Sequence, residues 1–296
     1  MPDAQTVLIA GGSGVIGTEL ARQLREAGHT ALVLVRRPAQ TPFERSWDPE
    51  ARWLRVGILD GVDAVVNLSG ASISRLPWTL QYKREILQSR IGATATLVDA
   101  MAKAETPPRV FISGSAVGYY GDRPGEILTE ESAPGDGFLA KVCVAWERAA
   151  APASAHSRVV YARTGLVLGE QGALKPIRML AKLGLAGPLG DGRQHWPWIS
   201  LFDEAAALRH LIETEVAGPM NLVAPGPVPA GEIIREVAED LGRPYWLPAP
   251  AWAIKLGLAD AGRELLLADQ DVSSARLTES GFEFRDTTVP EALAAV

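Results

Sequence analysis

Residues 6–37 read TVLIAGGSGVIGTELARQLREAGHTALVLVRR. The apolar run Thr6–Ala10 is typical of a strand buried on both faces. Residues 15–26 repeat apolar positions with helical periodicity, and Gly28 is placed to end that helix. A second apolar run follows at residues 31–35. This stretch therefore predicts a strand, a turn, a helix and a second strand within about thirty residues.

The turn between the first strand and the helix predicts a ligand. Its three glycines follow a G-x-x-G-x-x-G spacing, at Gly11, Gly14 and Gly17. Such a turn brings backbone N–H groups and the helix N-terminus against a phosphate, which a side chain would block. An ordinary glycine-rich loop is the alternative, but the flanking strand and helix favour dinucleotide binding.

The second strand ends in Arg36 and Arg37, and no acidic residue follows until Glu44. An NAD site usually has an acid at this position for the ribose 2′-OH, whereas an arginine suits a 2′-phosphate. The alternative is two solvated arginines. The pattern predicts NADP(H) as the cofactor.

Composition limits the class of protein. The 296 residues are 47% hydrophobic and 22% charged, as in a soluble globular protein, with a net charge of −6. The negative charge and the lack of a lysine-rich tract argue against a nucleic-acid partner. One cysteine, Cys143, and four histidines make a structural metal site unexpected. With no signal peptide and no apolar run of membrane length, we expect a cytoplasmic protein with no membrane partner.

Apolar runs and helical patterns alternate along the first half of the chain. This alternation predicts an α/β fold with a doubly wound parallel sheet of the NAD(P)-binding Rossmann type. The further strands are expected at 63–68, 110–113 and 158–163, and the helices at 82–104 and 139–150.

The second half of the chain differs from the first in composition and in its sequence patterns. Residues 172–198 are rich in glycine, with a helical pattern at 176–183, and three further helical patterns lie in 229–296. Two short strands, 199–201 and 220–223, flank a helical pattern at 203–215. We expect a cofactor-binding domain at 1–168, onto which 197–224 packs back, and a smaller substrate-side and helical region at 169–296.

The strand at 63–68 ends in small residues. Leu68, Ser69 and Gly70 are candidate contacts to the cofactor, because small residues at the carboxyl end of a parallel strand let it lie close to the backbone. A simple strand-to-loop turn is the alternative.

Motifs spread over nearly the whole chain carry a resemblance. In order they are GGSGVIG, LVRRP, SWDP, DAVVNLSGA, EILQSRIGAT, SAVGYYGD, FLAKVCVAWE, RTGLVLG, GDGRQHWPWIS and NLVAP, followed by LPAP, ELLL and GFEF. The chain resembles the extended short-chain dehydrogenase/reductases, which include the sugar-nucleotide epimerases. More narrowly, it is similar to an atypical branch called "epimerase family protein", which has an extra C-terminal region.

The resemblance implies a set of cofactor contacts. It implies that the glycine turn holds the pyrophosphate and that Arg36 holds the 2′-phosphate. Arg90 stands where typical members have an asparagine near the nicotinamide; it could contact a cofactor phosphate or the substrate, or pair with Glu85. The expected cofactor-binding set is Gly11, Ser13, Gly14, Val15, Ile16, Gly17, Arg36, Arg37, Leu68, Ser69, Gly70, Glu85, Arg90 and Val167.

The chain departs from the family at the catalytic pair. Typical members use Tyr-x-x-x-Lys, in which the lysine lowers the tyrosine pKa for acid–base work. None of the five tyrosines here has a lysine four residues on, and Phe138 aligns with the usual tyrosine. The standard proton donor is therefore absent.

Five residues are candidates for the remaining chemistry. Ser115 stands where the family has a Ser/Thr that hydrogen-bonds the reacting carbonyl, although a loop serine bonded to backbone groups is the alternative. Tyr119, Tyr120 or Lys141 could replace the missing donor, with Cys143 a remote further choice. For these the alternatives are tyrosine packing, a solvated lysine and a buried thiol.

The loop 193–198 is the candidate for substrate binding. Arg193 could hold an anionic group, and Trp196 or Trp198 could wall off an apolar moiety. The alternative, which we favour for Trp198, is that both tryptophans belong to the core. His195 is the histidine nearest a predicted site.

Two hypotheses follow. The first is an NADP-dependent oxidoreductase or epimerase that acts on a carbonyl or sugar-nucleotide-like small molecule with a non-standard proton donor. The second is an NADP-binding regulatory protein that has lost this chemistry; some members of the branch are linked to cell division. The retained Ser115 and the substrate-type second half favour the enzyme. The substrate and the oligomeric state are not predicted.

Overall fold

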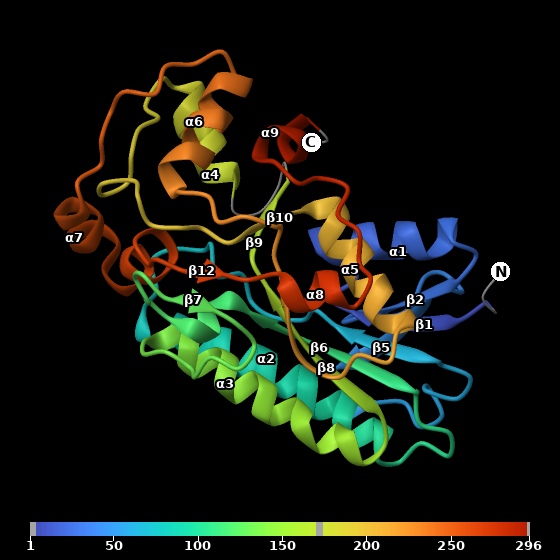
Figure 1. Ribbon diagram of the computed structural model, residues 1–296. Helices are drawn as coiled ribbons and strands as arrows, with labels where there is room; N and C mark the ends of the chain where they lie inside the picture. The colour runs from blue at the N-terminus through green and yellow to red at the C-terminus, as the bar shows by residue number, and fades with distance from the viewer. Residues whose placement is uncertain (1–3, 170–173, 295–296) are drawn as a thin grey trace.

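The computed structural model describes residues 4–169 and 174–294. Its centre is an eight-stranded sheet in the order β11-β8-β6-β5-β1-β2-β3-β4 (Figure 1). All pairings in this sheet are parallel except that of β3 with β4. The strands are β1 (Thr6–Ala10), β2 (Thr30–Val35), β3 (Glu44–Asp48), β4 (Trp53–Leu54), β5 (Ala64–Asn67), β6 (Val110–Ala116), β8 (Arg158–Thr164) and β11 (Gly218–Leu222). This is the doubly wound α/β fold that the alternating pattern predicts.

Helices cover both faces of the sheet. One face carries α1 (Val15–Glu26) and α5 (Leu201–Glu213), and the other carries α2 (Leu80–Met101) and α3 (Phe138–Ala150) (Figure 1). Successive side chains of β1 enter opposite cores, with Val7 and Ile9 on the α1 side and Leu8 and Ala10 on the α2 side. This alternation explains why β1 is apolar at every position from Val7 to Ala10.

The chain order places a crevice at the carboxyl edge of the sheet. From β1 the chain passes to β2 on one side, and later to β5 on the other. Ligands of open parallel sheets bind at such a reversal of strand order. The connection from α1 to β2 is short because the chain turns directly after the helix. Gly28 takes φ +86° in this turn, and the N–H of His29 donates to the carbonyl of Leu24 at 2.9 Å.

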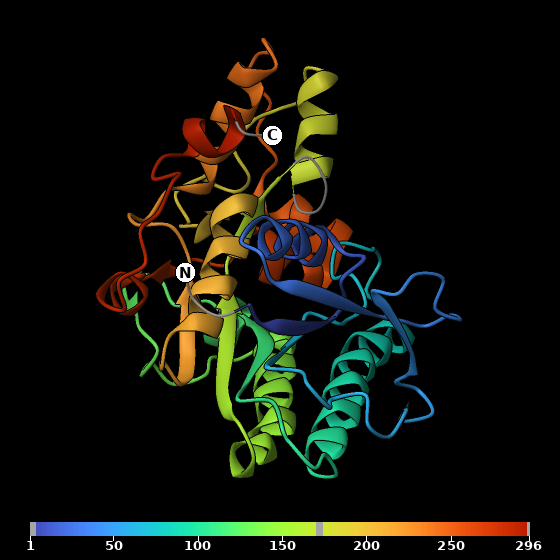
Figure 2. The ribbon, with the colours of Figure 1, turned by 90° about the vertical axis from the view of Figure 1, so that its right-hand side faces the viewer.

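A second lobe stands beside this edge (Figure 2). Its helices are α4 (Leu174–Lys182), α6 (Ala230–Asp240), α7 (Ala251–Ala261) and α9 (Val289–Ala294). It joins the sheet domain through the parallel pair β9 (Leu166–Leu168) and β10 (Trp198–Ser200). The remaining elements are β7 (Ile127–Leu128), which pairs with β12 (Asp271–Val272), α8 (Ala275–Glu279), a π-helical turn at Gly262–Leu266, and 3-10 turns at Val117–Tyr120 and Ala151–Ala155.

Two expectations from the sequence are corrected here. The segment 44–48, which is not among the expected strands, forms the strand β3 beside β2. The long helix starts at Leu80, where the Thr79 hydroxyl accepts from the N–H of Tyr82 at 3.1 Å, and it ends at Met101 instead of continuing to 104.

The second half of the chain contributes to the central sheet. β11 pairs in parallel with β8, and α5 packs beside α1. The division into 1–168 and 169–296 remains a prediction.

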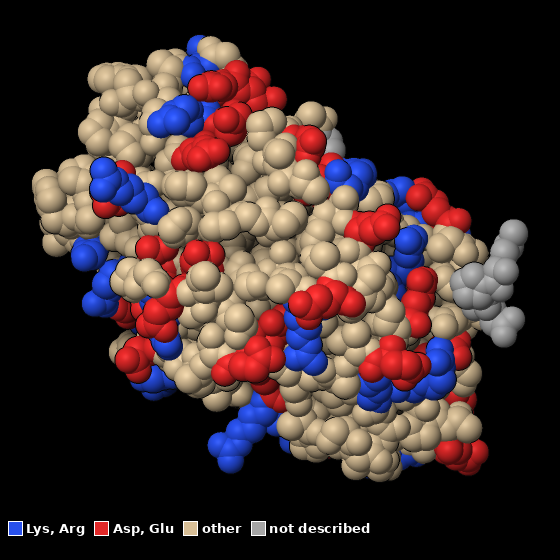
Figure 3. All heavy atoms as spheres, viewed as in Figure 1, with Lys and Arg blue, Asp and Glu red and all other residues tan. Residues whose placement is uncertain are grey.

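Within the described part of the chain no helix is long and apolar enough to cross a bilayer. Acidic and basic side chains are interspersed over the face in Figure 3.

Candidate functional site

The glycine turn joins β1, β5 and α1 by close backbone contact. Gly11 has φ +83°, and a Cβ there would lie 2.8 Å from the carbonyl carbon of Leu68. A Cβ on Gly17 would lie 2.5 Å from the carbonyl oxygen of Gly11. The N–H of Gly14 donates to that same carbonyl at 3.0 Å and closes the turn. Gly11 and Gly17 are therefore required by the fold itself.

The start of α1 is open to an anion. Gly14 is its N-cap, no side chain caps it, and its first turn has no acidic residue. The first N–H groups of a helix lack intrahelical partners, and the helix dipole adds positive potential there. Because a Cβ on Gly14 would meet only the Gly11 carbonyl oxygen, at 3.2 Å, the fold demands glycine less strictly here. These features fit a pyrophosphate, as does the exposed Ser13 beside Gly14.

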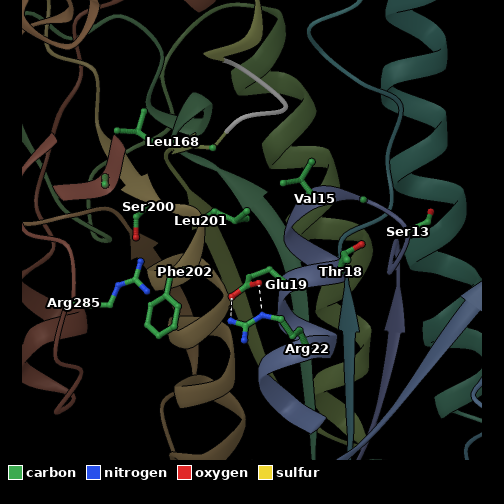
Figure 4. Close-up of a pocket in the computed structure, with 13 residues that line it drawn as sticks. Ser13, Val15, Thr18, Glu19, Arg22, Leu168, Ser200, Leu201, Phe202 and Arg285 are labelled. Carbon is green, nitrogen blue, oxygen red and sulfur yellow. Dashed lines mark hydrogen bonds and ion pairs between the residues drawn. The ribbon is translucent and has the colours of Figure 1, made fainter. Parts of the chain in front are cut away.

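A pocket of about 580 Å³ opens beside this turn (Figure 4). Ser13, Gly14 and Val15 form one end of it, and Leu168, at the end of β9, forms the facing wall together with the start of α5. Its lining does not include Ser115 or Arg90. The pocket therefore flanks the phosphate turn and is separate from the candidate catalytic residues. Val167, also in β9, is half-buried and pairs in register with Ile199.

The two arginines that follow β2 have different environments. Arg37 forms a bidentate ion pair with Glu44 on β3, with Nη2–Oε1 at 2.7 Å and Nη1–Oε2 at 2.9 Å. Arg36 is exposed and has no ion pair within the described residues. Glu44, the first acid after the strand, therefore neutralises Arg37 and leaves Arg36 as the available guanidinium.

The end of β5 is held by a small polar network. Asn67 donates from Nδ2 to the Thr94 hydroxyl at 2.9 Å and accepts from the N–H of Ser69 at 3.2 Å. Trp146 donates to the same hydroxyl at 3.0 Å. The Ser69 Oγ is buried and has no hydrogen-bond partner among residues 4–169 and 174–294. A buried hydroxyl without a partner is costly, so this atom fits a ligand oxygen at the sheet edge.

Arg90 lies against Gly70. A Cβ on Gly70 would lie 2.9 Å from the guanidinium carbon, so the glycine makes room for the arginine. Arg90 Nη1 donates to the carbonyls of Ala71 and Ile86, both at 3.0 Å. Glu85 is exposed, and within residues 4–169 and 174–294 it makes no ion pair with Arg90.

Ser115 belongs to a buried charged network at the end of β6. It is 5% exposed, and its hydroxyl donates to Glu147 Oε1 at 2.7 Å. Arg163 on β8 binds the same carboxylate from Nε at 2.9 Å and from Nη2 at 3.0 Å. Glu147 and Arg163 were not predicted to be functional, although Glu147 ends the motif FLAKVCVAWE and Arg163 begins RTGLVLG.

Tyr120 is a structural member of this network. It is 0% exposed, donates to Asn221 Oδ1 at 2.6 Å and accepts from Arg163 Nη1 at 3.0 Å. Burial raises its pKa to about 12. The structure therefore argues against Tyr120 as the replacement proton donor. Tyr119 is half-buried, with the guanidinium carbon of Arg163 3.6 Å from its ring centroid.

The two candidates on α3 also differ in position. Lys141 is exposed on the solvent side of the helix, where Val144 and Arg148 also lie. Lys141 therefore lies outside the buried network of Ser115, and its role as a proton donor stays a prediction. Cys143 faces inward near Ser115, and burial raises its pKa to about 12, so it is a neutral thiol.

The C-terminal lobe covers the position of the missing tyrosine. Phe138 is the first residue of α3, and its N–H donates to Glu264 Oε1 at 2.9 Å. The N–H of Leu139 donates to Glu264 Oε2 at 2.7 Å. Lys83 pairs with Asp260 of α7, and its Nζ lies 5.1 Å from the Phe138 ring centroid. The lobe thus caps α3 at the point where typical members place the tyrosine.

The substrate-side loop is built around a histidine–aspartate pair. His195 Nδ1 lies 2.8 Å from Asp269 Oδ1, which also accepts from the His195 N–H at 2.9 Å. Gln270 ties this loop to the turn after Ser115, because its side chain donates to the carbonyls of Val117 and Gly121 at 3.0 and 2.8 Å. Arg193 is exposed. Nothing in the sequence pattern pointed to Asp269, 74 residues away.

The tryptophans of this loop are core residues. Trp198 is 1% exposed and Trp196 is 6% exposed, and both pack in the apolar core of the C-terminal lobe. The burial of Trp198 agrees with the core position that the sequence favours for it, so Trp198 does not line an open substrate site. Within the described ranges no group of three or more His, Cys, Asp or Glu side chains is arranged to hold a metal.

The switch-point crevice, the glycine turn and the uncapped α1 together define a Rossmann-type dinucleotide-binding protein. The chain belongs to the NAD dependent epimerase/dehydratase family, whose model matches residues 7–223. A domain of unknown function, DUF1731, matches residues 249–296 and accounts for the extra C-terminal region.

Named relatives match along almost the whole chain. Epimerase family protein Mb2239 of Mycobacterium bovis is 40% identical over 97% of this chain and 96% of its own. Epimerase family protein SDR39U1 of Bos taurus is 34% identical over 94% and 95%. These relatives confirm the atypical branch of extended short-chain dehydrogenase/reductases.

Two solved structures are similar in fold and sequence. The human epimerase family protein SDR39U1 (isoform 2), solved with NADPH, has a TM-score of 0.89 and 31% identity over 98% of both chains. MoeE5, solved with UDP-glucuronic acid and NAD, has a TM-score of 0.78 and 25% identity over 98% of this chain and 96% of its own.

Proposed function

We propose that this protein binds NADP(H) along the carboxyl edge of the sheet and transfers hydride between it and a small molecule with a hydroxyl or carbonyl group. The observation that carries the proposal is the combination of an uncapped glycine turn with Arg36 at the end of β2, which forms no ion pair with any residue that the structure describes. The NADPH in the human relative supports the cofactor. The UDP-glucuronic acid in MoeE5 supports a sugar-nucleotide-like substrate.

The contacts follow from the order of the strands. The turn at 11–17 would hold the pyrophosphate, and Arg36, beyond β2, would hold the 2′-phosphate. The nicotinamide half would then extend over the ends of β5, β6 and β9, where Ser69 and Val167 lie and where Arg90 of α2 reaches Gly70. A bound nicotinamide supplies hydride chemistry, and this chain must supply the movement of the proton.

Ser115 and Glu147 form the proton path in this proposal. The Ser115 hydroxyl already donates its hydrogen to a carboxylate, so the lone pairs of its oxygen can accept a hydrogen bond from a substrate. A substrate hydroxyl would donate to Ser115 Oγ while Ser115 passes its own proton to Glu147. This arrangement suits the deprotonation of a hydroxyl better than the protonation of a carbonyl. It also replaces the tyrosine–lysine pair without requiring Tyr120.

Cofactor choice tests the binding half of the proposal. In calorimetric titrations we expect NADPH to bind more tightly than NADH. Arg36→Ala should lower NADPH affinity by about 1.5–3 kcal/mol, the range for a charged hydrogen bond. Arg37→Ala is the matched control, since Glu44 already engages that guanidinium. Equal affinities of the parent protein for NADPH and NADH would contradict the assignment.

Turnover tests the chemical half. Against a panel of carbonyl compounds, sugar nucleotides and their hydroxyl forms, we expect slow turnover, because a standard acid–base pair contributes about 10²–10⁴-fold. Ser115→Ala should reduce the rate and leave NADPH affinity nearly unchanged. A rate that Ser115→Ala does not alter would place the chemistry elsewhere.

The second candidate function is an NADP-binding protein without chemistry. The observation in its favour is Phe138, which lacks an acidic proton and whose N–H is capped by Glu264. This candidate would be supported if the protein bound NADPH but neither oxidised it nor reduced NADP⁺ with any compound of the panel.

A further inference from the structure

Arg90 is a half-buried cation without a counter-ion among the described residues. Its Nη1 donates to two backbone carbonyls, and no described residue accepts from its Nε or Nη2. No carboxylate in residues 4–169 and 174–294 forms an ion pair with it, whereas Arg163 has Glu147 and Lys83 has Asp260. Burial lowers the pKa of Arg90 because desolvation penalises its charge, but an arginine remains protonated at neutral pH.

The surroundings do not neutralise this charge. The Cys143 thiol, whose charge would be negative, is kept protonated because burial raises its pKa to about 12. The Trp146 ring centroid lies 5.0 Å from the guanidinium carbon, which offers a cation–π contact without a net charge. Within the described residues, the end of β5 therefore carries one half-buried positive charge without a counter-ion, which is less well solvated than a charge on the surface.

The position of the guanidinium is fixed. Gly70 leaves the space that it fills at the end of β5, and the Ser69 hydroxyl beside Gly70 has no partner. Arg36 marks the adenosine side of the crevice, so Arg90 stands on the nicotinamide side.

We propose that Arg90 makes this site bind NADPH more tightly than NADP⁺. The inference rests on the proposed binding of NADP(H). The two forms share the same phosphates, but the oxidised nicotinamide ring carries a positive charge that the reduced ring lacks. A fixed cation on the nicotinamide side disfavours the oxidised ring and leaves the neutral ring unaffected.

This preference has a consequence for the direction of the reaction inside the site. When the reduced form is the better-bound form, the equilibrium between bound species shifts toward NADPH and the oxidised substrate. In that direction a substrate C–H bond gives its hydride to NADP⁺, and its O–H proton passes through Ser115 to Glu147. The unpaired arginine and the serine–glutamate contact thus favour the same direction, which is the first half-reaction of an epimerisation through a carbonyl.

The ratio of two dissociation constants tests the proposal without a known substrate. NADPH would be titrated by its fluorescence and NADP⁺ by calorimetry, both on the full chain. In the parent protein we expect NADPH to bind on the order of tenfold more tightly than NADP⁺. Arg90→Gln should bring the ratio close to one, and Arg90→Lys, which keeps the charge, should retain most of it. Arg84→Gln, on the exposed face of the same helix, is the matched control and should leave the ratio unchanged.

Failure of this inference and failure of the proposed function would give different binding results. Equal dissociation constants for NADPH and NADP⁺ in the parent protein would overturn the inference and leave the proposed function intact. An Arg90→Gln variant that weakens both forms by the same factor would also overturn it, because the arginine would then act on a shared phosphate or on the fold. Arg36→Ala should weaken both forms equally, since both carry the 2′-phosphate. Binding of neither form to the parent protein would contradict the proposed function itself. Thermal unfolding of each variant without ligand checks that it is folded.

Discussion

At the scale of single residues, the two adjacent tyrosines show how burial decides a role. Both follow Ser115 on one loop, and their positions in the sequence do not distinguish them. The Tyr120 hydroxyl has two polar partners in the interior, while no described residue hydrogen-bonds that of Tyr119. Tyr119 instead covers Arg163 with its ring, so it keeps a phenol that is not committed to the core.

We expect Tyr120→Phe to lower the free energy of unfolding by about 1–3 kcal/mol, because Asn221 Oδ1 loses its donor and Arg163 loses an acceptor. NADPH affinity should stay unchanged. Tyr119→Phe, the matched control, should stay within about 0.5 kcal/mol of the parent. Urea unfolding measures both. A Tyr120→Phe variant that keeps the stability of the parent protein but loses turnover would show that the Tyr120 phenol takes part in the reaction.

Several site residues could be read from the sequence because their chemistry is local. The glycine turn and Arg36 follow from a pattern within about thirty residues. Glu147, Arg163 and Asp269 could not be found in this way. Each acts through a partner between 16 and 74 residues away, and the sequence does not say which of many charged residues meet.

At the scale of elements, the turn between β1 and α1 contains glycines that are required for two different reasons, the fold and the ligand. Gly11 and Gly17 meet backbone atoms below 3.0 Å, so any Cβ there forces the fold to shift. Gly14 has a nearest contact at 3.2 Å and a φ of −77°, which other residues adopt. The fold therefore requires glycine at two positions, whereas at Gly14 the ligand is the stronger requirement.

Gly14→Val should abolish NADPH binding and leave the fold largely intact, because the added side chain would occupy the space of the pyrophosphate. Gly17→Val should instead destabilise the protein, since its Cβ would lie 2.5 Å from the Gly11 carbonyl oxygen. Circular dichroism and titration with NADPH separate the two effects. A folded Gly14→Val protein with normal NADPH affinity would disprove the phosphate turn.

The sequence does not predict β3, because its side-chain pattern depends on which neighbouring elements cover it. β3 reads ERSWD, and an edge-side strand with one buried residue, Trp47, has no run of apolar side chains to reveal it. The buried strands β1, β5 and β6 were found because both of their faces are covered.

At the scale of the whole molecule, the C-terminal region contacts the segments around the carboxyl edge of the central sheet. Glu264 caps α3, Asp260 pairs with Lys83, and Gln270 holds the loop after Ser115. These contacts join segments more than a hundred residues apart, so composition and periodicity could not predict them. The candidate catalytic edge is thus built from both halves of the chain.

The joining of the halves also buries an acid, which makes stability depend on pH. Glu204, in the first turn of α5, is 0% exposed, and its Oε1 accepts from the Thr164 hydroxyl at 2.7 Å. Its Oε2 has no partner in the described part of the chain. Burial raises its pKa from 4.5 to about 8. Between these two pH values the folded protein holds a proton that the unfolded chain has released. The free energy of unfolding therefore falls as the pH rises through this window.

We expect the parent protein to lose a few kcal/mol of stability between pH 5 and pH 8.5, on the order of 1.4 kcal/mol for each unit of pKa shift. Burial also raises the pKa values of Asp203 and Glu130, and these add a slope of the same sign. Glu204→Gln keeps an acceptor for Thr164 and removes the titration, so it should flatten most of the slope. Glu239→Gln, at an exposed position on α6, should leave the slope as it is in the parent protein. Urea unfolding at several pH values decides the matter, since a Glu204→Gln protein with the parental slope would show that this carboxyl is ionised in the folded state.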